Sequence, residues 1–226
     1  MNVSTTDESR PAPELGPDQL LSTTRSVRLR LDLTRPVARS LIEECLNLAQ
    51  QAPSGGNQQG WSFVVVTDRD KRQALGTLYK QGWDVYLKSI SSRLTADSAA
   101  TMPSRDVLRV YRSAQHLADH MGDVPVLVVP CIAGRTENEG VAEQAGQWGS
   151  ILPAVWSFML AARARGLGTC WTTLHLAHER EAAELLGIPY DDVMQTALIP
   201  VAHTMGDEFR PGPRKPLDTI AHWEQW

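Results

Sequence analysis

The sequence has few cysteines and no long run of residues with one charge. Its three cysteines, Cys45, Cys131 and Cys170, lie far apart and form no C-x-x-C pair, which argues against a disulfide framework and a thiolate zinc site. The 22 Lys and Arg residues are outnumbered by 26 Asp and Glu residues and do not gather into a basic cluster, so no nucleic-acid partner is expected. These features predict a protein of the reducing cytoplasm.

Several common catalytic motifs are also missing. The chain has neither a G-x-x-x-x-G-K-[ST] phosphate loop nor a G-x-S-x-G nucleophile elbow. His116 and His120 are four residues apart on an expected helix and could face one metal, and His175 and His178 are three apart near an expected loop. Neither pair has a third ligand in view, so surface or capping histidines are favoured over a metal site. No catalytic side chain is predicted, which indicates that a bound cofactor carries the chemistry.

The N-terminus and the rest of the chain differ in composition. Residues 1–16 are acidic and proline-rich, without a basic segment followed by an apolar one, so a flexible tail is predicted rather than a secretory signal. The remaining residues, 17–226, are expected to form a single domain.

One uncharged stretch, residues 144–162, is nearly long enough to cross a membrane. Its glutamines and glycines and Pro153 argue against a membrane span. A helix that is apolar all round must be buried by its own domain or by a partner subunit, so an oligomer is expected. Residues 222–226 carry two tryptophans, which are expected to pack on the partner or on their own subunit.

Hydrophobic periodicity predicts interleaved helices and strands, and hence an α/β or α+β layered fold with at least four strands. Helices are expected within residues 17–30 and at 36–52, 71–88, 105–121, 144–162 and 179–186. Strands are expected at residues 62–68, 124–132, 168–174 and 195–202, and a loop at 89–104. The pattern leaves the strand order open.

Three segments carry groups suited to an anionic flavin cofactor. In the segment 25–28, Arg25 and Arg28 flank a serine, a set that can bind a phosphate or a flavin carbonyl. Residues 52–61 are small and polar, so their backbone could approach a flat ring. Residues 210–216 present arginines on a proline-rich loop. Taken singly, each segment could also be a helix end, a connecting loop or a surface turn.

Taken in order, the motifs resemble the FMN-dependent nitroreductase family. They are R-S-x-R at 25–28, A-P-S-x-x-N at 52–57, L-A-A-x-x-x-G-L-G-x-x-W at 160–171, L-G-I-P at 186–189 and R-K-P at 214–216. The resemblance runs from about residue 20 to the C-terminus. It implies an α+β nitroreductase-like fold with a central, mainly antiparallel sheet flanked by helices. It also implies an intertwined homodimer with FMN at the subunit interface.

The resemblance assigns cofactor-binding roles to particular positions. The matching residues are Arg25, Ser26, Arg28, Pro53, Ser54, Gly55, Asn57, Thr172, Thr173, Leu174 and Arg214. The first three match the cluster that holds the FMN phosphate and the polar edge of the ring, and Arg214 matches a late phosphate-binding arginine. The residues from 53 to 57 match a loop that reaches the flavin of the other subunit. The segment 172–174 matches the one whose backbone amide approaches flavin N5.

The family's chemistry implies that NADH or NADPH passes hydride to flavin N5, after which a nitroaromatic or quinone is reduced by a ping-pong mechanism. Residues 80–105 and 133–145 are expected to select the acceptor. Alternatives are a relative with other flavin chemistry, such as dehalogenation, azoline oxidation or flavin breakdown, and a flavin-binding protein without turnover. The chain departs from the family pattern at Thr24, Gly60, Pro153 and Ser157, which puts the identity of the substrate in doubt.

Overall fold

A computed structural model describes residues 14–96 and 105–226 of the chain. Its α-helices are α1 (Pro17–Thr23), α2 (Arg39–Ala49), α3 (Arg69–Ala96), α4 (Arg105–His120), α5 (Val141–Ala164) and α6 (Glu179–Leu186). Its strands are β1 (Trp61–Val66), β2 (Val126–Ala133), β3 (Leu167–Thr169), β4 (Val193–Gln195) and β5 (Ile199–His203). Short 3-10 helices are η1 (Gly55–Asn57), η2 (Met121–Asp123), η3 (Leu174–His178) and η4 (Leu217–Thr219).

The strands form one five-stranded sheet of order β1-β2-β5-β3. Strand β4 also pairs with β2, at the C-terminal end of β2, whereas β5 pairs with its N-terminal end. Every pairing between named strands is antiparallel, with Phe63 opposite Pro130 and Val126 opposite Val201. This arrangement confirms the predicted α+β class and the antiparallel sheet.

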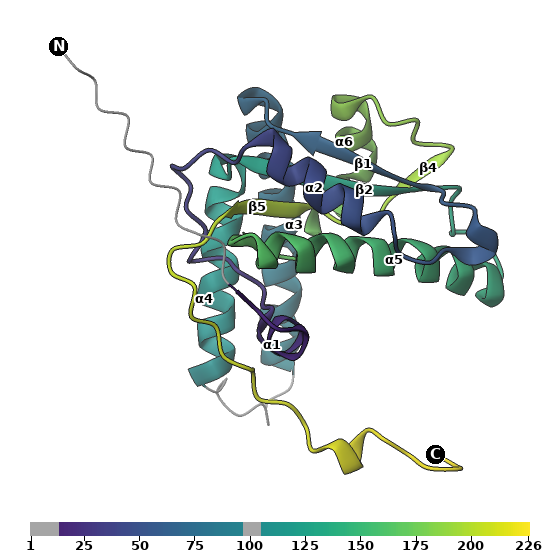
Figure 1. Cartoon of the computed structure of the whole chain (residues 1–226). Coiled ribbons are helices and arrows are strands. Elements are labelled where there is room, and N and C mark those ends of the chain that lie inside the picture. The colour runs from purple at the N-terminus through teal and green to yellow at the C-terminus, as the bar shows by residue number, and fades with distance from the viewer. Residues whose placement is uncertain (1–13, 97–104) are drawn as a thin grey trace.

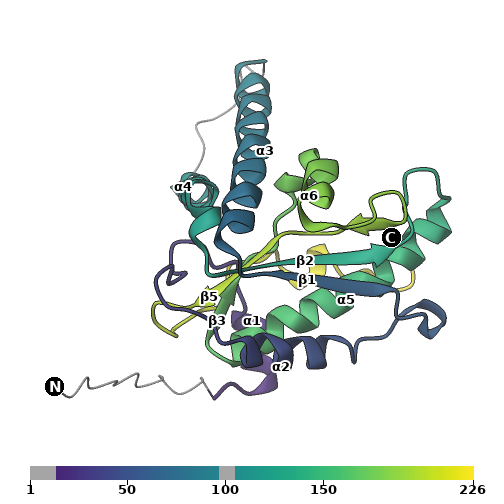
Figure 2. The same cartoon turned by 90° about the horizontal axis from the view of Figure 1, so that it is seen from above.

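Helices cover both faces of the sheet, which explains why β2 is apolar throughout. Leu127 and Val129 of β2 belong to the core beneath α3 and α4, whereas Val126 and Val128 belong to the core beneath α2 and α5. Successive side chains of a strand point to opposite faces, so a central strand between two cores has no polar side. Figures 1 and 2 show α2 and α5 on one face and α3, α4 and α6 on the other.

The structure corrects three expectations about elements. Residues 89–96 were predicted as loop but continue α3, while 97–104 lie outside the described residues. The predicted strand 168–174 is paired only as far as Thr169, after which the chain turns into η3. The predicted strand 195–202 is two strands, β4 and β5, which pair with different parts of β2. The N-terminal tail and the single domain stay predictions.

Helix α5 packs on α2 and the sheet along one side and leaves apolar side chains uncovered on another. Leu152 is 40% exposed and Trp156 is 42% exposed. The chain after β5 leaves the body as an extension (Figure 1), and Trp223 is 86% exposed at its end. The terminal tryptophans therefore do not cover their own subunit, as one alternative had it. Among the described residues, no helix is long and apolar enough to span a membrane.

Candidate functional site

The segment 25–31 is attached to the edge of the sheet beside β3. Ser26 forms a bridge with Thr169, and the Val27 amide donates a 2.8 Å hydrogen bond to the Thr169 carbonyl. This contact requires glycine at position 168, because a Cβ there would lie 2.9 Å from Cγ1 of Val27. The glycine of the G-L-G motif thus lets the arginine-bearing segment pack directly on the sheet.

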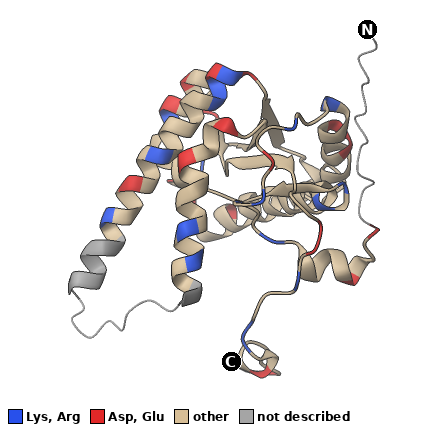
Figure 3. Cartoon of the chain, turned by 90° about the vertical axis from the view of Figure 1, so that its left-hand side faces the viewer, with Lys and Arg blue, Asp and Glu red and all other residues tan. Residues whose placement is uncertain are grey.

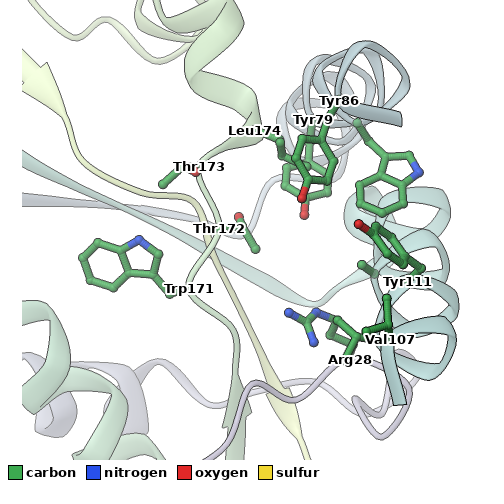
Figure 4. Close-up of a pocket in the computed structure, with 12 residues that line it drawn as sticks. Arg28, Tyr79, Tyr86, Val107, Tyr111, Trp171, Thr172, Thr173 and Leu174 are labelled. Atoms are coloured by element: carbon green, nitrogen blue, oxygen red, sulfur yellow. The ribbon is translucent and has the colours of Figure 1, made fainter. Parts of the chain in front are cut away.

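Arg28 lines a cavity of about 560 Å³ between the sheet edge and the pair α3 and α4. We call it the aromatic cavity. It is lined by Arg28, Tyr79, Trp83, Tyr86, Val107, Val110, Tyr111, Ala114, Trp171, Thr172, Thr173 and Leu174. Figure 4 shows the Arg28 guanidinium and Thr172 on one side, with Tyr79, Tyr86 and Tyr111 facing them. The structure therefore brings four of the predicted residues, Arg28 and 172–174, into one site.

Buried polar groups hold this wall of the aromatic cavity in place. The Thr172 hydroxyl donates a hydrogen bond to the Leu198 carbonyl. Burial raises the pKa of the Tyr79 hydroxyl, and the Arg28 charge and the Thr172 side chain oppose that shift. Burial raises the pKa of the Cys170 thiol as well, and Arg28 and Ser26 oppose that shift. The thiol therefore stays protonated at neutral pH, behind the two predicted binding residues.

The late loop, residues 210–216, lies against Arg25. Gly212 approaches the Arg25 guanidinium so closely that there is no room for a Cβ. Nη1 of Arg25 is buried and has no hydrogen-bond partner among the described residues. Arg214 follows two residues later and is exposed, with Nη1 donating to the Pro213 carbonyl. The guanidiniums of Arg25 and Arg214 and the Ser26 hydroxyl are donors of the kind that bind a phosphate-like anion.

The loop 53–57 lies elsewhere, in contact with α5. The Gly55 amide donates a 3.0 Å hydrogen bond to Oγ of Ser150, which in turn donates to the Gly146 carbonyl. Ser54 and Gly55 line a second cavity of about 470 Å³, the loop cavity, together with Gln147 and Ser150. Pro53 and Asn57 line neither cavity. Within one chain, the predicted loop residues and Arg28 therefore belong to different sites.

Charge compensation differs between the two cavities. Arg135 in the loop cavity forms a 2.7 Å ion pair with Glu179 and a second ion pair with Glu137. By contrast, no carboxylate among the described residues forms an ion pair with Arg25, Arg28 or Arg214. Figure 3 shows Lys and Arg residues along the segment that leads to the C-terminus. The three guanidiniums that the motifs assign to an anionic ligand are therefore not compensated by a carboxylate within the described part of the chain.

Comparison with known proteins decides the family. A sequence model of the Nitroreductase family matches residues 21–203. The chain belongs to the Nitroreductase family. A 4-nitrobenzoate reductase of Pseudomonas putida is 29% identical over 180 residues, covering 68% of this chain and 70% of the relative.

Two solved structures share the fold of this Nitroreductase family member. The FMN and NADPH-dependent nitroreductase of sphigopyxis sp. strain HMH has a TM-score of 0.66 and 24% identity, covering 94% of this chain and 100% of its own. An oxidised iodotyrosine deiodinase bound to FMN and 3-iodo-L-tyrosine has a TM-score of 0.67 and 18% identity, covering 92% of this chain and 98% of its own. At these identities the likeness concerns the fold alone.

The structure corrects the prediction for one histidine pair. His175 is fully buried, not a surface or capping residue, and burial lowers its pKa to about 4 although the Gln195 side chain opposes that shift. Neither ring nitrogen has a hydrogen bond of ordinary geometry within the described part of the chain. The rings of His116 and His120 stack 4.4 Å apart. No group of metal-ligating side chains is found among residues 14–96 and 105–226.

The sequence interpretation singled out none of the aromatic side chains that α3 and α4 contribute to the cavity, although Trp83 and Tyr86 lie in the segment 80–105 that was expected to select the acceptor. Tyr79, Trp83 and Tyr86 are spaced by four and three residues on α3, so they share one helix face. Tyr111 lies on the same face of α4 as Val107 and Ala114. That spacing can be read from the sequence. Core residues of a helix have the same spacing, however, so it does not by itself indicate a binding site.

Proposed function

We propose that this chain is an FMN-dependent oxidoreductase that takes hydride from NADH or NADPH and reduces an electron-poor acceptor such as a nitroaromatic or a quinone. The observation that carries the proposal is the shared cavity of Arg28 and the segment Thr172–Leu174. Family membership and the FMN named for the solved relatives support it. Bound FMN would supply the hydride-accepting atom N5 and would pass electrons to the acceptor.

The residues of the chain fit defined tasks toward that cofactor. Arg25 and Arg214 would hold its phosphate, with the unpartnered Nη1 of Arg25 as one donor. Arg28 would place a positive charge at the polar edge of the ring and stabilise the negative charge of its reduced form. The backbone of Thr172–Leu174, fixed by the Thr172–Leu198 hydrogen bond, would keep the ring in place.

We propose further that the chain acts as a homodimer. The uncovered α5 side chains Leu152 and Trp156 lie on the helix whose residues Gln147 and Ser150 line the loop cavity. A partner packed on α5 would cover the apolar face and bring the loop 53–57 to the partner's flavin. The exposed C-terminal tryptophans are suited to the same interface. Within one chain, the loop 53–57 and Arg28 lie at different cavities. This supports a dimer in which the loop of one subunit reaches the flavin of the other.

A cytoplasmic location is proposed on the basis of the cysteines. Cys45, Cys131 and Cys170 are all free and buried. Free thiols persist in reducing compartments.

Steady-state kinetics tests the proposed reaction. Initial rates at several concentrations of NADPH and a nitroaromatic should give parallel double-reciprocal lines, because donor and acceptor use the same site in turn. Intersecting lines, which require a ternary complex, would contradict the ping-pong mechanism. A holoprotein that NADH and NADPH both fail to reduce would instead be a flavin-binding protein without turnover.

A further inference from the structure

We propose that Tyr86 of α3 and Tyr111 of α4 form an acceptor clamp, in which both phenol hydroxyls donate hydrogen bonds to oxygen atoms of a planar aromatic acceptor. This inference rests on the proposed function and specifies the ligand of the same site. It assigns two specificity-determining residues that lie outside every motif of the sequence.

The clamp is built from two facing helices. Figure 4 shows Tyr86 extending from α3 and Tyr111 from α4, with the hydroxyls of both directed into the aromatic cavity. Tyr86 is 42% exposed, so it stands at the mouth of the cavity, whereas Tyr111 is half-buried. A ligand entering between the helices would therefore meet both phenols.

The three tyrosines of the cavity differ in how available their hydroxyl groups are to a ligand. Tyr79 is buried, with 4% of its surface exposed. Its side chain is therefore less accessible to an entering ligand than those of Tyr86 and Tyr111. Within residues 14–96 and 105–226, the hydroxyls of Tyr86 and Tyr111 have no hydrogen-bond partner. Both phenols can therefore donate a hydrogen bond to a ligand.

The remaining wall selects for a flat ring. The Trp83 indole N–H donates a 2.7 Å hydrogen bond to Oε1 of Gln115, which leaves the apolar ring for contact. The Trp83 and Tyr86 rings lie 5.8 Å apart at 42°, a tilted arrangement typical of aromatic clusters. Val107 and Val110 add apolar surface opposite.

The charge of the wall favours acceptors that carry oxygen atoms. Arg28 is the only ionised side chain among the described residues that line the aromatic cavity, and no carboxylate faces it there. A cationic group would find no partner on this wall. Nitro and quinone oxygens would accept hydrogen bonds from the two phenols. The predicted ligand class is therefore a planar, neutral or anionic aromatic compound with exposed oxygen atoms.

Binding to the oxidised FMN holoprotein tests the clamp with nitrobenzene and toluene as probes. Toluene keeps the ring and lacks the nitro oxygens. Binding is followed by the change in flavin absorbance. Tyr86→Phe and Tyr111→Phe should each raise the Kd of nitrobenzene about three- to tenfold, the effect of one lost neutral hydrogen bond, and leave the Kd of toluene unchanged. Tyr190→Phe, which removes a hydroxyl outside the cavity, should alter neither.

The outcomes separate the clamp from the proposed function. If the wild-type holoprotein is reduced by NADH or NADPH but nitrobenzene does not bind, or binds equally to wild type and both variants, the clamp is wrong and the proposed function stands. An equal loss of toluene and nitrobenzene binding would show a packing effect and would also overturn the clamp. Failure to bind FMN, or to be reduced, would overturn the proposed function itself.

Discussion

Gly212 lies directly against the Arg25 guanidinium, and the contact leaves no space for a side chain at position 212. It joins a segment near the start of the domain to the late loop near its end. The R-S-x-R and R-K-P motifs, separated in the sequence by most of the chain, are therefore neighbours in the fold. The proposed phosphate site depends on this contact.

The first prediction concerns Gly212→Ala. The added methyl group must displace the Arg25 guanidinium or the loop, so one charge-assisted contact to the FMN phosphate should be lost. We expect the Kd for FMN, measured by flavin fluorescence, to rise roughly ten- to hundredfold. Gly16→Ala is the control, because a Cβ at position 16 meets nothing within 4 Å. Equal FMN affinity in both variants would refute the role of the contact.

The second prediction separates Arg214 from its neighbour. Both Arg214 and Lys215 are exposed on the late loop, but only Arg214 is assigned to the phosphate. Arg214→Ala should weaken FMN binding by about 1.5–3 kcal/mol without lowering the melting temperature of the apoprotein, whereas Lys215→Ala should keep the wild-type affinity. Equal losses for the two variants would indicate general electrostatic attraction instead of a specific site.

Much of this fold could be predicted from the sequence because apolar periodicity records which faces are buried. Helix α2 and strand β2 were found within a few residues of their ends for that reason. The predicted strand 168–174 was too long, since the apolar residues after Thr169 are buried or half-buried without a strand partner. Residues 89–96 are rich in serine and were assigned to a loop, although they continue α3. Local propensity does not record such tertiary effects.

The residues of the candidate site that lie in or next to short sequence motifs could be predicted, whereas those contributed singly by separate helices could not. Arg28 belongs to a short motif and Thr172 directly follows another, and the structure places them in one cavity. Tyr86 and Tyr111 come from separate helices without a local signature, so only the packing of α3 and α4 brings them together. The burial of His175 likewise depends on contacts distant in sequence.

The third prediction is a pH dependence of stability due to His175. Its pKa is lowered from 6.5 to about 4 by burial, so the unfolded chain takes up a proton at higher pH than the folded chain. The free energy of unfolding should therefore fall as the pH decreases from about 6.5 to about 4, by about 3 kcal/mol from this residue.

Urea denaturation at pH 7.5 and at pH 4.5 measures this effect. The difference in unfolding free energy between the two pH values should be smaller in His175→Gln than in the wild type. His222→Gln, at an exposed position, should keep the wild-type difference. An unchanged pH dependence in His175→Gln would show that the buried imidazole does not titrate as stated.

The fourth prediction tests the homodimer. Leu152→Glu and Trp156→Glu place a carboxylate on the uncovered face of α5, where a partner subunit could bury it only at a large free-energy cost. Light scattering should show a dimer for the wild type and a monomer for the double variant. The monomer should retain less FMN, because the loop 53–57 would be missing from its site. A monomeric wild type at micromolar concentration would refute the dimer.

Anaerobic titration of the purified protein with NADH and with NADPH, after incubation with FMN, is the decisive test of the proposed flavin chemistry. Here the bound flavin serves as its own indicator. We expect the protein to retain FMN through gel filtration, to lose the flavin absorbance band on addition of at least one of the two reductants, and to regain the band when a nitroaromatic is added. A protein that stays colourless after incubation with FMN, or one whose bound flavin neither reductant bleaches, would contradict it.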